Sequence, residues 1–185
     1  MNSKKAGSRK NGVREEKRRR DNARKARQIA DKEFPDEKWK VVEEGIFLSP
    51  QRRIGKHSSY LNELRDAQIL RDLGNTVYLV PELRSNNNKK YDAIVNDMEM
   101  EFKNMHGASV VTLKDRFLYS REQAPNVFLN LEKSSLTKHE IIKTLYATRN
   151  SADYDKKNKY KGGRIILKLK EQKDLVYLNV DDFKT

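Results

Sequence analysis

The 185-residue chain contains no cysteine and has only three histidines, at positions 57, 106 and 139. The absence of cysteine excludes disulfide bonds and cysteine-based zinc sites. The histidines are scattered along the sequence, so they do not form a histidine-rich metal site. These two absences remove the commonest metal centres of small basic proteins from consideration.

Long apolar runs are absent as well. No run approaches the roughly 20 residues that cross a bilayer, and residues 1–30 lack the apolar centre of a secretory signal peptide. Hydrophobic residues make up 36% of the chain and charged residues another 36%. We therefore expect no membrane span and a site of action in a cytoplasm, either that of the producing cell or that of another cell.

Positive charge is in excess, with a formal net charge of +13 and a pI near 9.8. This excess favours a polyanionic partner, either nucleic acid or an acidic protein. Residues 1–40 carry a net +8 and the other 145 residues a net +5. We interpret residues 1–40 as a basic arm, disordered over 1–12 and helix-permissive over 13–33, and residues 41–185 as the folded domain. The arm either contacts phosphates or is a solubilising leader or linker.

Local signals predict alternating helices and strands in the folded domain. A helix from Ser58 or Ser59 to Leu73 has Gly74 as its terminating residue, and Thr137 with Glu140 forms a capping-box signature. Val110 and Val111 are expected to be packing positions. The expected segments are a strand and turn within 38–56, a strand at 76–83, a helix at 109–123, a strand at 126–132, a polar loop at 149–163, and strands at 164–170 and 176–180.

The segment from Tyr91 to Asn104 predicts a β-hairpin, because Asn96 and Asp97 both tolerate the positive φ of a two-residue turn. In this register Asp92 lies opposite Glu101. One face then carries the apolar side chains from Tyr91 to Phe102. The other face carries Asp92, Ile94, Glu99, Glu101 and Lys103.

Facing carboxylates repel each other, so Asp92 opposite Glu101 requires a compensating cation. Lys103 on the same face could supply it, and so could a divalent ion, since Mg²⁺ is commonly held by one or two carboxylates with waters and phosphate. The alternative is a solvated outer face of an edge hairpin. Glu99, nearer the turn, is interpreted as a solvated carboxylate.

An ordered set of short motifs accompanies the hairpin. The segments are Glu63, Ala67 and Leu70 on the first helix, Leu79-Val80-Pro81-Glu82, Tyr91-Asp92-Ala93-Ile94, Glu101-Phe102-Lys103, and Gln123-Ala124-Pro125-Asn126-Val127. This order resembles the PD-(D/E)XK nuclease superfamily. It is closest to the C-terminal nuclease domains, many directed at tRNA, of contact-dependent growth-inhibition and polymorphic toxins. Tyr91 stands where the superfamily's name has Pro, and residues 1–40 have no counterpart.

The resemblance implies a fold, a metal and a set of residue roles. The fold is α/β (α+β), a restriction-endonuclease-like αβββαβ core with a mixed central sheet flanked by helices, plus the basic arm. The implied metal is Mg²⁺ or Mn²⁺, bound by Asp92 and Glu101 with the Phe102 carbonyl, and Glu63 completes the shell or positions water. Lys103 then orients or activates the attacking water.

The helix at 109–123 supplies candidate nucleic-acid contacts, namely Lys114, Arg116, Arg121 and Gln123. Their alternative interpretations are a solvated helix face and, for Gln123, hydrogen bonding at the end of the helix. The predicted function is a metal-dependent nuclease that cleaves RNA, with tRNA preferred over DNA, acting as a toxin domain with a cognate immunity protein. The alternatives are a DNA endonuclease of a phage or mobile element and a non-catalytic basic nucleic-acid-binding module.

Overall fold

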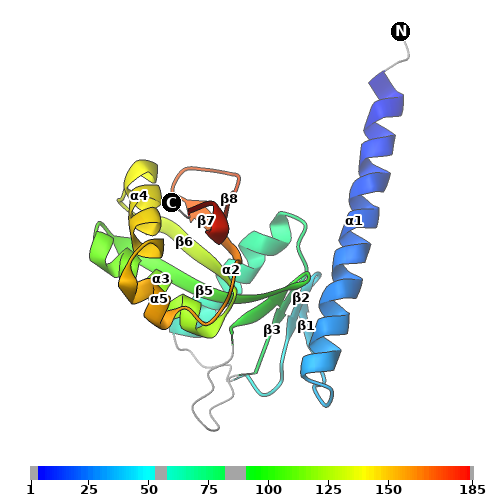
Figure 1. Cartoon of the computed structure of the whole chain (residues 1–185). Coiled ribbons are helices and arrows are strands. Elements are labelled where there is room, and N and C mark those ends of the chain that lie inside the picture. Colours follow the sequence, from blue (N-terminus) through cyan, green and yellow to red (C-terminus); the bar gives the residue numbers. More distant parts are fainter. Residues whose placement is uncertain (1–3, 53–57, 82–90, 184–185) are drawn as a thin grey trace. The chain divides into compact units, whose positions relative to one another are not determined.

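The computed structural model describes residues 4–52, 58–81 and 91–183 (Figure 1). Hydrogen bonds pair its strands in chain order from β1 to β8. The chain divides into two compact units, residues 1–81 with 94–98, and residues 82–93 with 99–185. We call these unit 1 and unit 2. The predicted boundary between an arm at 1–40 and a domain at 41–185 stays a prediction.

Unit 1 begins with the long helix α1 (Lys4–Glu33), followed by β1 (Lys40–Glu43), β2 (Ile46–Leu48), α2 (Ser58–Asp72) and β3 (Val77–Leu79). β2 pairs antiparallel with β1 and parallel with β3. Both α1 and α2 pack on β3. Phe47 stacks on Tyr78 with ring centroids 4.4 Å apart, and Trp39 meets the same tyrosine edge-on at 5.0 Å. This aromatic cluster fixes the segment that follows α1 against β2 and β3.

Unit 2 contains most of β5 (Met98–Gly107), then α3 (Val110–Gln123), β6 (Asn126–Ser134), α4 (Lys138–Arg149), α5 (Ala152–Lys157), β7 (Arg164–Leu169), β8 (Val176–Asn179) and the short 3-10 helix η1 (Val180–Phe183). β5, β6 and β7 are parallel, and β8 is antiparallel to β7. Figure 1 shows α3, α4 and α5 gathered against these strands. The core lies between them and includes Leu113, Phe117, Leu129, Leu145 and Ile165.

The predicted fold class is confirmed. The mixed sheet is flanked by helices in each unit, and the chain order α2, β3, β4 (Ala93–Val95), β5, α3, β6 is the expected αβββαβ order. Gly74 follows α2 with φ of +85°. The Thr137 capping box is present in full, with Glu140 bonding back to the Thr137 backbone. Among the described helices none is both long and apolar enough to span a bilayer.

Three local expectations were wrong. The helix that was expected to start at 13 begins at Lys4, so residues 4–12 are helical. The loop expected at 149–163 contains α5, which the side chain of Ser151 caps at its N-terminus. Val110 and Val111 are 43% and 64% exposed, because the first turn of α3 extends past the core that Leu113 and Phe117 enter.

Candidate functional site in the β4–β5 hairpin

The turn of the β4–β5 hairpin has the two residues predicted, Asn96 and Asp97. Asn96 adopts a φ of +55°, so one of the two turn residues uses the left-handed region. Its side-chain oxygen accepts the Thr76 N–H at 2.9 Å, and its own N–H donates to the Thr76 carbonyl at 2.9 Å. The turn is therefore held within unit 1, and it sets the register of the strands that leave it.

Asp92 lies one residue before β4 and is held beside Glu101 by two hydrogen bonds. Its N–H donates to the Met100 carbonyl at 3.1 Å, and its Oδ2 accepts the Phe102 N–H at 2.9 Å. Met100 and Phe102 are the two chain neighbours of Glu101. The carboxylate of Asp92 thus replaces a backbone acceptor at the point where the expected strand pairing stops.

Glu101 is completely buried, and its Oε1 forms an ion pair with the Lys103 ammonium. The Lys103 side chain is 12% exposed. β5 is an inner strand that pairs with β6, and Ile94 on β4 is buried as well. The alternative of a solvated face on an edge hairpin is therefore excluded. A buried carboxylate requires a partner charge. The sequence offered Lys103 or a divalent ion for this role, and Lys103 supplies the charge in this structure.

The sheet register places these charges on the helix-covered side. Glu101 pairs with Val127 and Lys103 with Leu129, and both partners belong to the core beneath α3 and α4. Side chains alternate along a strand, so Phe102 points to the opposite side, where its ring meets that of Phe128 at 5.7 Å. Both faces of β5 are packed, which holds Glu101 and Lys103 on a rigid strand.

The donor chemistry of this pair suits a hard divalent cation. Asp92 and Glu101 offer carboxylate oxygens, and the predicted Phe102 carbonyl would add a neutral oxygen. In the described part of the chain, no three or more Asp, Glu, His or Cys side chains group closely enough to enclose a metal. The described side chains thus supply two carboxylates, a number that Mg²⁺ accepts when water and phosphate oxygens complete its octahedron.

Glu63, the fourth predicted catalytic residue, belongs to α2 in unit 1. Its Oε2 forms an ion pair with Arg52, whose guanidinium also donates to the Val80 carbonyl at 2.5 Å. The Glu63 side chain is 16% exposed. The arrangement shows a charged, largely buried glutamate on α2, and its place in the same site as Asp92 and Glu101 stays a prediction.

The four predicted nucleic-acid contacts on α3 differ in availability. Lys114 pairs with Asp153 of α5 at 2.9 Å, and this contact raises the pKa of the lysine and lowers that of the aspartate. Arg116 is exposed. Arg121 is fully buried, which corrects the prediction that it contacts phosphate. Burial lowers the pKa of Arg121, and its guanidinium is committed to the protein itself.

The bonds of Arg121 attach a downstream loop to the end of α3. The guanidinium donates to Asn158 Oδ1 at 3.1 Å and to the carbonyls of Pro125, Tyr160 and Gly162, the last two at 3.0 and 2.7 Å. Arg121 is therefore a structural residue that shapes the loop between α5 and β7.

Tyr160 connects this loop to the end of α3. The Tyr160 hydroxyl donates to the Gln123 carbonyl at 2.9 Å. Burial raises the pKa of Tyr160, and the negative charges of Glu99 and Glu101 raise it further. Tyr160 therefore lies near the candidate carboxylates. Sequence reasoning missed it, although an aromatic residue between two lysines and before Gly-Gly in KYKGG was a usable signal.

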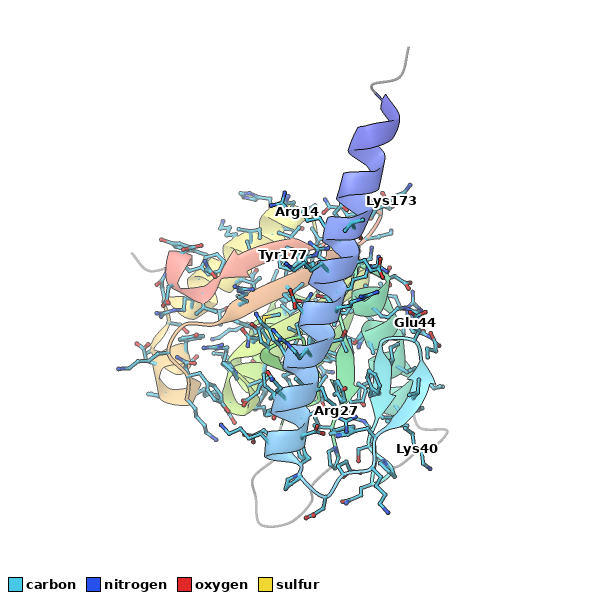
Figure 2. The ribbon with its side chains drawn as sticks, turned by 90° about the vertical axis from the view of Figure 1, so that its right-hand side faces the viewer. Arg14, Arg27, Lys40, Glu44, Lys173 and Tyr177 are labelled. Atoms are coloured by element: carbon cyan, nitrogen blue, oxygen red, sulfur yellow. The ribbon has the colours of Figure 1, made fainter. Side chains whose placement is uncertain are left out.

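The N-terminal helix is basic on its exposed surface. Residues 12–20 are all exposed, and Arg14, Lys17 and Arg24 recur at helical spacing on the side away from buried Ala26 and Ala30. The acids of this stretch pair locally, as Glu15 does with Arg19 at 3.2 Å. Figure 2 labels Arg14 and Arg27 along the helix. Both interpretations of the arm, phosphate contact and solubilising leader, fit this surface.

The chain has a mixed α/β fold with an αβββαβ core, and the inner strand β5 carries a buried acid–lysine pair. No family model matches the sequence, and no curated protein matches it either. A chain of the CdiA-CT/CdiI toxin and immunity complex from Burkholderia pseudomallei is similar in structure, with a TM-score of 0.50 and 21% sequence identity. The match covers 71% of this chain and 97% of that chain, and it shows a shared fold.

Proposed function

We propose that this chain is a metal-dependent nuclease that cleaves RNA phosphodiester bonds. The observation that carries the proposal is the buried Glu101–Lys103 pair with Asp92 bonded to the residues on either side of Glu101. A purely structural domain gains little from burying an acid beside a second acid, because desolvation offsets most of the ion-pair energy. Such groups are typical of sites that perform chemistry.

The roles of the residues follow from their chemistry. Asp92 and Glu101, with the Phe102 carbonyl, would hold Mg²⁺ or Mn²⁺. When bound, such an ion lowers the pKa of water and offsets the charge that develops on a phosphate. Lys103 places an ammonium beside Glu101, where it can orient the attacking water and attract a phosphate oxygen. Glu63 is the proposed further acid of the site.

The biological role that we propose is a toxin domain acting on tRNA inside a target cell. The shared fold with a chain of a toxin and immunity complex supports it. The net charge of +13 would favour an acidic immunity protein as the partner that blocks the domain in the producing cell. Both the toxin role and the immunity partner depend on this likeness of fold.

Cleavage assays test the enzymatic proposal. Purified protein is incubated with tRNA and, in parallel, with plasmid DNA, in Mg²⁺ and in EDTA. The expected result is Mg²⁺-dependent cleavage of tRNA that Glu101→Gln and Lys103→Gln each slow by about a hundredfold or more. Glu99→Gln is the matched control, an acid on the same strand, and its rate should stay near that of the wild type. Variants that cut as fast as the wild type would overturn the assigned site.

The basic surface of α1 favours one second candidate, a non-catalytic nucleic-acid-binding module. Arg14, Lys17 and Arg24 would then contact phosphates without any chemistry. This function predicts binding that weakens steeply with salt and survives EDTA, with no cleavage in any metal. Preferential cutting of plasmid DNA would instead support a DNA endonuclease.

A further inference from the structure

A pocket of about 360 Å³ lies within unit 2, where α4 ends and the loop before β7 begins. Its walls include Arg149 from α4, Tyr154 from α5, Tyr160, Lys161 and Gly162 from the loop, and Asp181 from η1. We call it the Arg149 pocket. Ligand pockets commonly have volumes of about 300–1,000 Å³. This one is therefore large enough for a nucleotide-sized group and too small for a duplex.

Arg149 brings a largely buried positive charge to this pocket. Its guanidinium lies over the Tyr154 ring, 4.7 Å from the centroid. Its buried Nε has no hydrogen-bond partner among the described residues. Its ion pair with Asp155 is long, at 4.0 Å, and the Asp155 side chain is 80% exposed. A cation that is 15% exposed and so weakly paired favours an anionic ligand.

A second guanidinium adds to the positive potential. The guanidinium of Arg121 lies 6.0 Å from the Tyr154 centroid, and it donates to four neutral oxygens, those of the Asn158 side chain and of three backbone carbonyls. The charge of Arg149 contributes to lowering the pKa of Arg121, after burial, which shows that the two cations repel each other. Lys161 is exposed at the rim. Because Arg121 is bonded to the loop, the pocket walls are fixed before a ligand binds.

One acid, Asp181, also lines the pocket, so a simple anion would bring no matching donor for this carboxylate. A nucleotide matches both kinds of charge, since its phosphate is negative and its ribose hydroxyls donate hydrogen bonds. Carboxylates are common partners of ribose hydroxyls, and the 2′-hydroxyl is the group by which proteins distinguish RNA from DNA. Opposite charges in one pocket thus point to a ribonucleotide.

The pocket also adjoins the candidate carboxylates. Tyr160 lines the pocket, and the negative charges of Glu99 and Glu101 contribute to raising its pKa. Asn126, which pairs with Met100 across the sheet, bonds to the Glu99 carbonyl at 3.0 Å and accepts the Arg164 N–H at 3.0 Å, just after the loop. The loop and the start of β5 are therefore joined through Asn126.

We propose that the Arg149 pocket binds one nucleotide of the RNA strand being cleaved. Arg149 and Lys161 bind its phosphate, and Asp181 accepts hydrogen bonds from its ribose. This inference rests on the proposed nuclease function and assigns a specificity site to it. It explains how the domain would prefer RNA.

Binding is measured by calorimetry with adenosine 5′-monophosphate as the probe, on the slowed Glu101→Gln protein. Loss of one charge-assisted phosphate contact is worth about 1.5–3 kcal/mol, so Arg149→Gln should weaken binding about tenfold or more. Lys161→Gln should weaken it too, and this exposed residue can be replaced without risk to folding. Lys156→Gln, an exposed lysine on neighbouring α5, is the matched control and should bind normally.

Further probes separate the parts of the proposal. Adenosine should bind much more weakly than the monophosphate, and the deoxynucleotide should bind more weakly than the ribonucleotide unless Asp181 is replaced by Asn. Equal affinity for the deoxynucleotide would overturn the ribose contact. Unchanged affinity in both Arg149→Gln and Lys161→Gln would overturn the pocket.

Cleavage kinetics distinguish this inference from the proposed function. In otherwise wild-type protein, Arg149→Gln should raise KM for RNA with a smaller effect on kcat, because the residue holds the strand away from the reacting phosphate. If RNA is cleaved with unchanged KM, the pocket assignment fails and the nuclease stands. If no nucleic acid is cleaved but nucleotide binding still depends on Arg149, the nuclease fails and the pocket stands.

Discussion

Replacing Arg121 with Met tests whether this arginine is structural, as its geometry indicates. The change keeps a long side chain but removes all four hydrogen bonds, to Asn158 and to the carbonyls of Pro125, Tyr160 and Gly162. Bonds from a charged donor each contribute about 1.5–3 kcal/mol net, and the cost of burying the guanidinium offsets part of the sum. We expect the free energy of unfolding to fall by about 3 kcal/mol. Removing one partner of a buried ion pair typically costs about 3–5 kcal/mol, and this estimate lies at the lower end.

Urea unfolding followed by far-UV circular dichroism measures this loss. With a denaturant slope of about 2 kcal/mol per molar urea, the midpoint of unit 2 should fall by about 1.5 M. Fluorescence of Trp39, the single tryptophan, reports unit 1 and provides an internal comparison. Arg116→Met, on an exposed position of the same helix, should change stability by less than about 0.5 kcal/mol.

The opposite pattern would refute the structural role. If Arg121→Met is as stable as the wild type but binds RNA more weakly, the guanidinium contacts substrate, as the sequence first suggested. A loss of stability in Arg121→Met, with none in the Arg116→Met control, would support the buried geometry.

Three further outcomes follow from the described contacts. Gly163→Ala should unfold at a markedly lower temperature, because the loop holds φ at +109° and an added Cβ would collide with the Pro125 carbonyl. Burial raises the pKa of Tyr154 and Tyr160 above the ordinary 10.0. The stability that their neutral form contributes is therefore full below pH 10 and is lost as the pH rises through the pKa values of the folded state. Melting temperatures measured against pH, together with tyrosinate absorbance, check this. Mg²⁺ or Mn²⁺ should raise the melting temperature of the wild type and leave that of Glu101→Gln unchanged, and equal shifts in both would contradict the metal assignment.

Features determined by a few neighbouring residues were predictable from the sequence. Gly74 ends α2 because only a left-handed residue fits there, and Thr137 with Glu140 closes a helix end within four residues. The Asn96 turn and the acid–lysine spacing on β5 belong to the same class. Their structural causes lie inside the segment that shows the pattern.

Features that depend on distant residues were not predictable in this way. Arg121 looks like one more basic residue of a helix face, and the acceptors that bury it include Tyr160 and Gly162, roughly forty positions later. Val110 and Val111 fit the apolar pattern of α3, yet the helix starts beyond the core. Asp92 lies beside Glu101 as expected, but the bond that its carboxylate accepts from the Phe102 N–H is not part of a regular hairpin pairing.

The length of α1 has a consequence for how the protein opens. Within its described side chains, Ala26 and Ala30 are the fully buried ones, and exposed pairs such as Glu15–Arg19 add only about 0.3–0.5 kcal/mol each. Residues 12–20 should therefore unwind at a free energy far below that of global unfolding. Their amide hydrogens should exchange rapidly, and trypsin should cut among their arginines while the rest of the chain stays folded. The exposed basic segment of α1 would then be a part that proteolysis can remove while buried Ala26 and Ala30 keep the end of the helix in place.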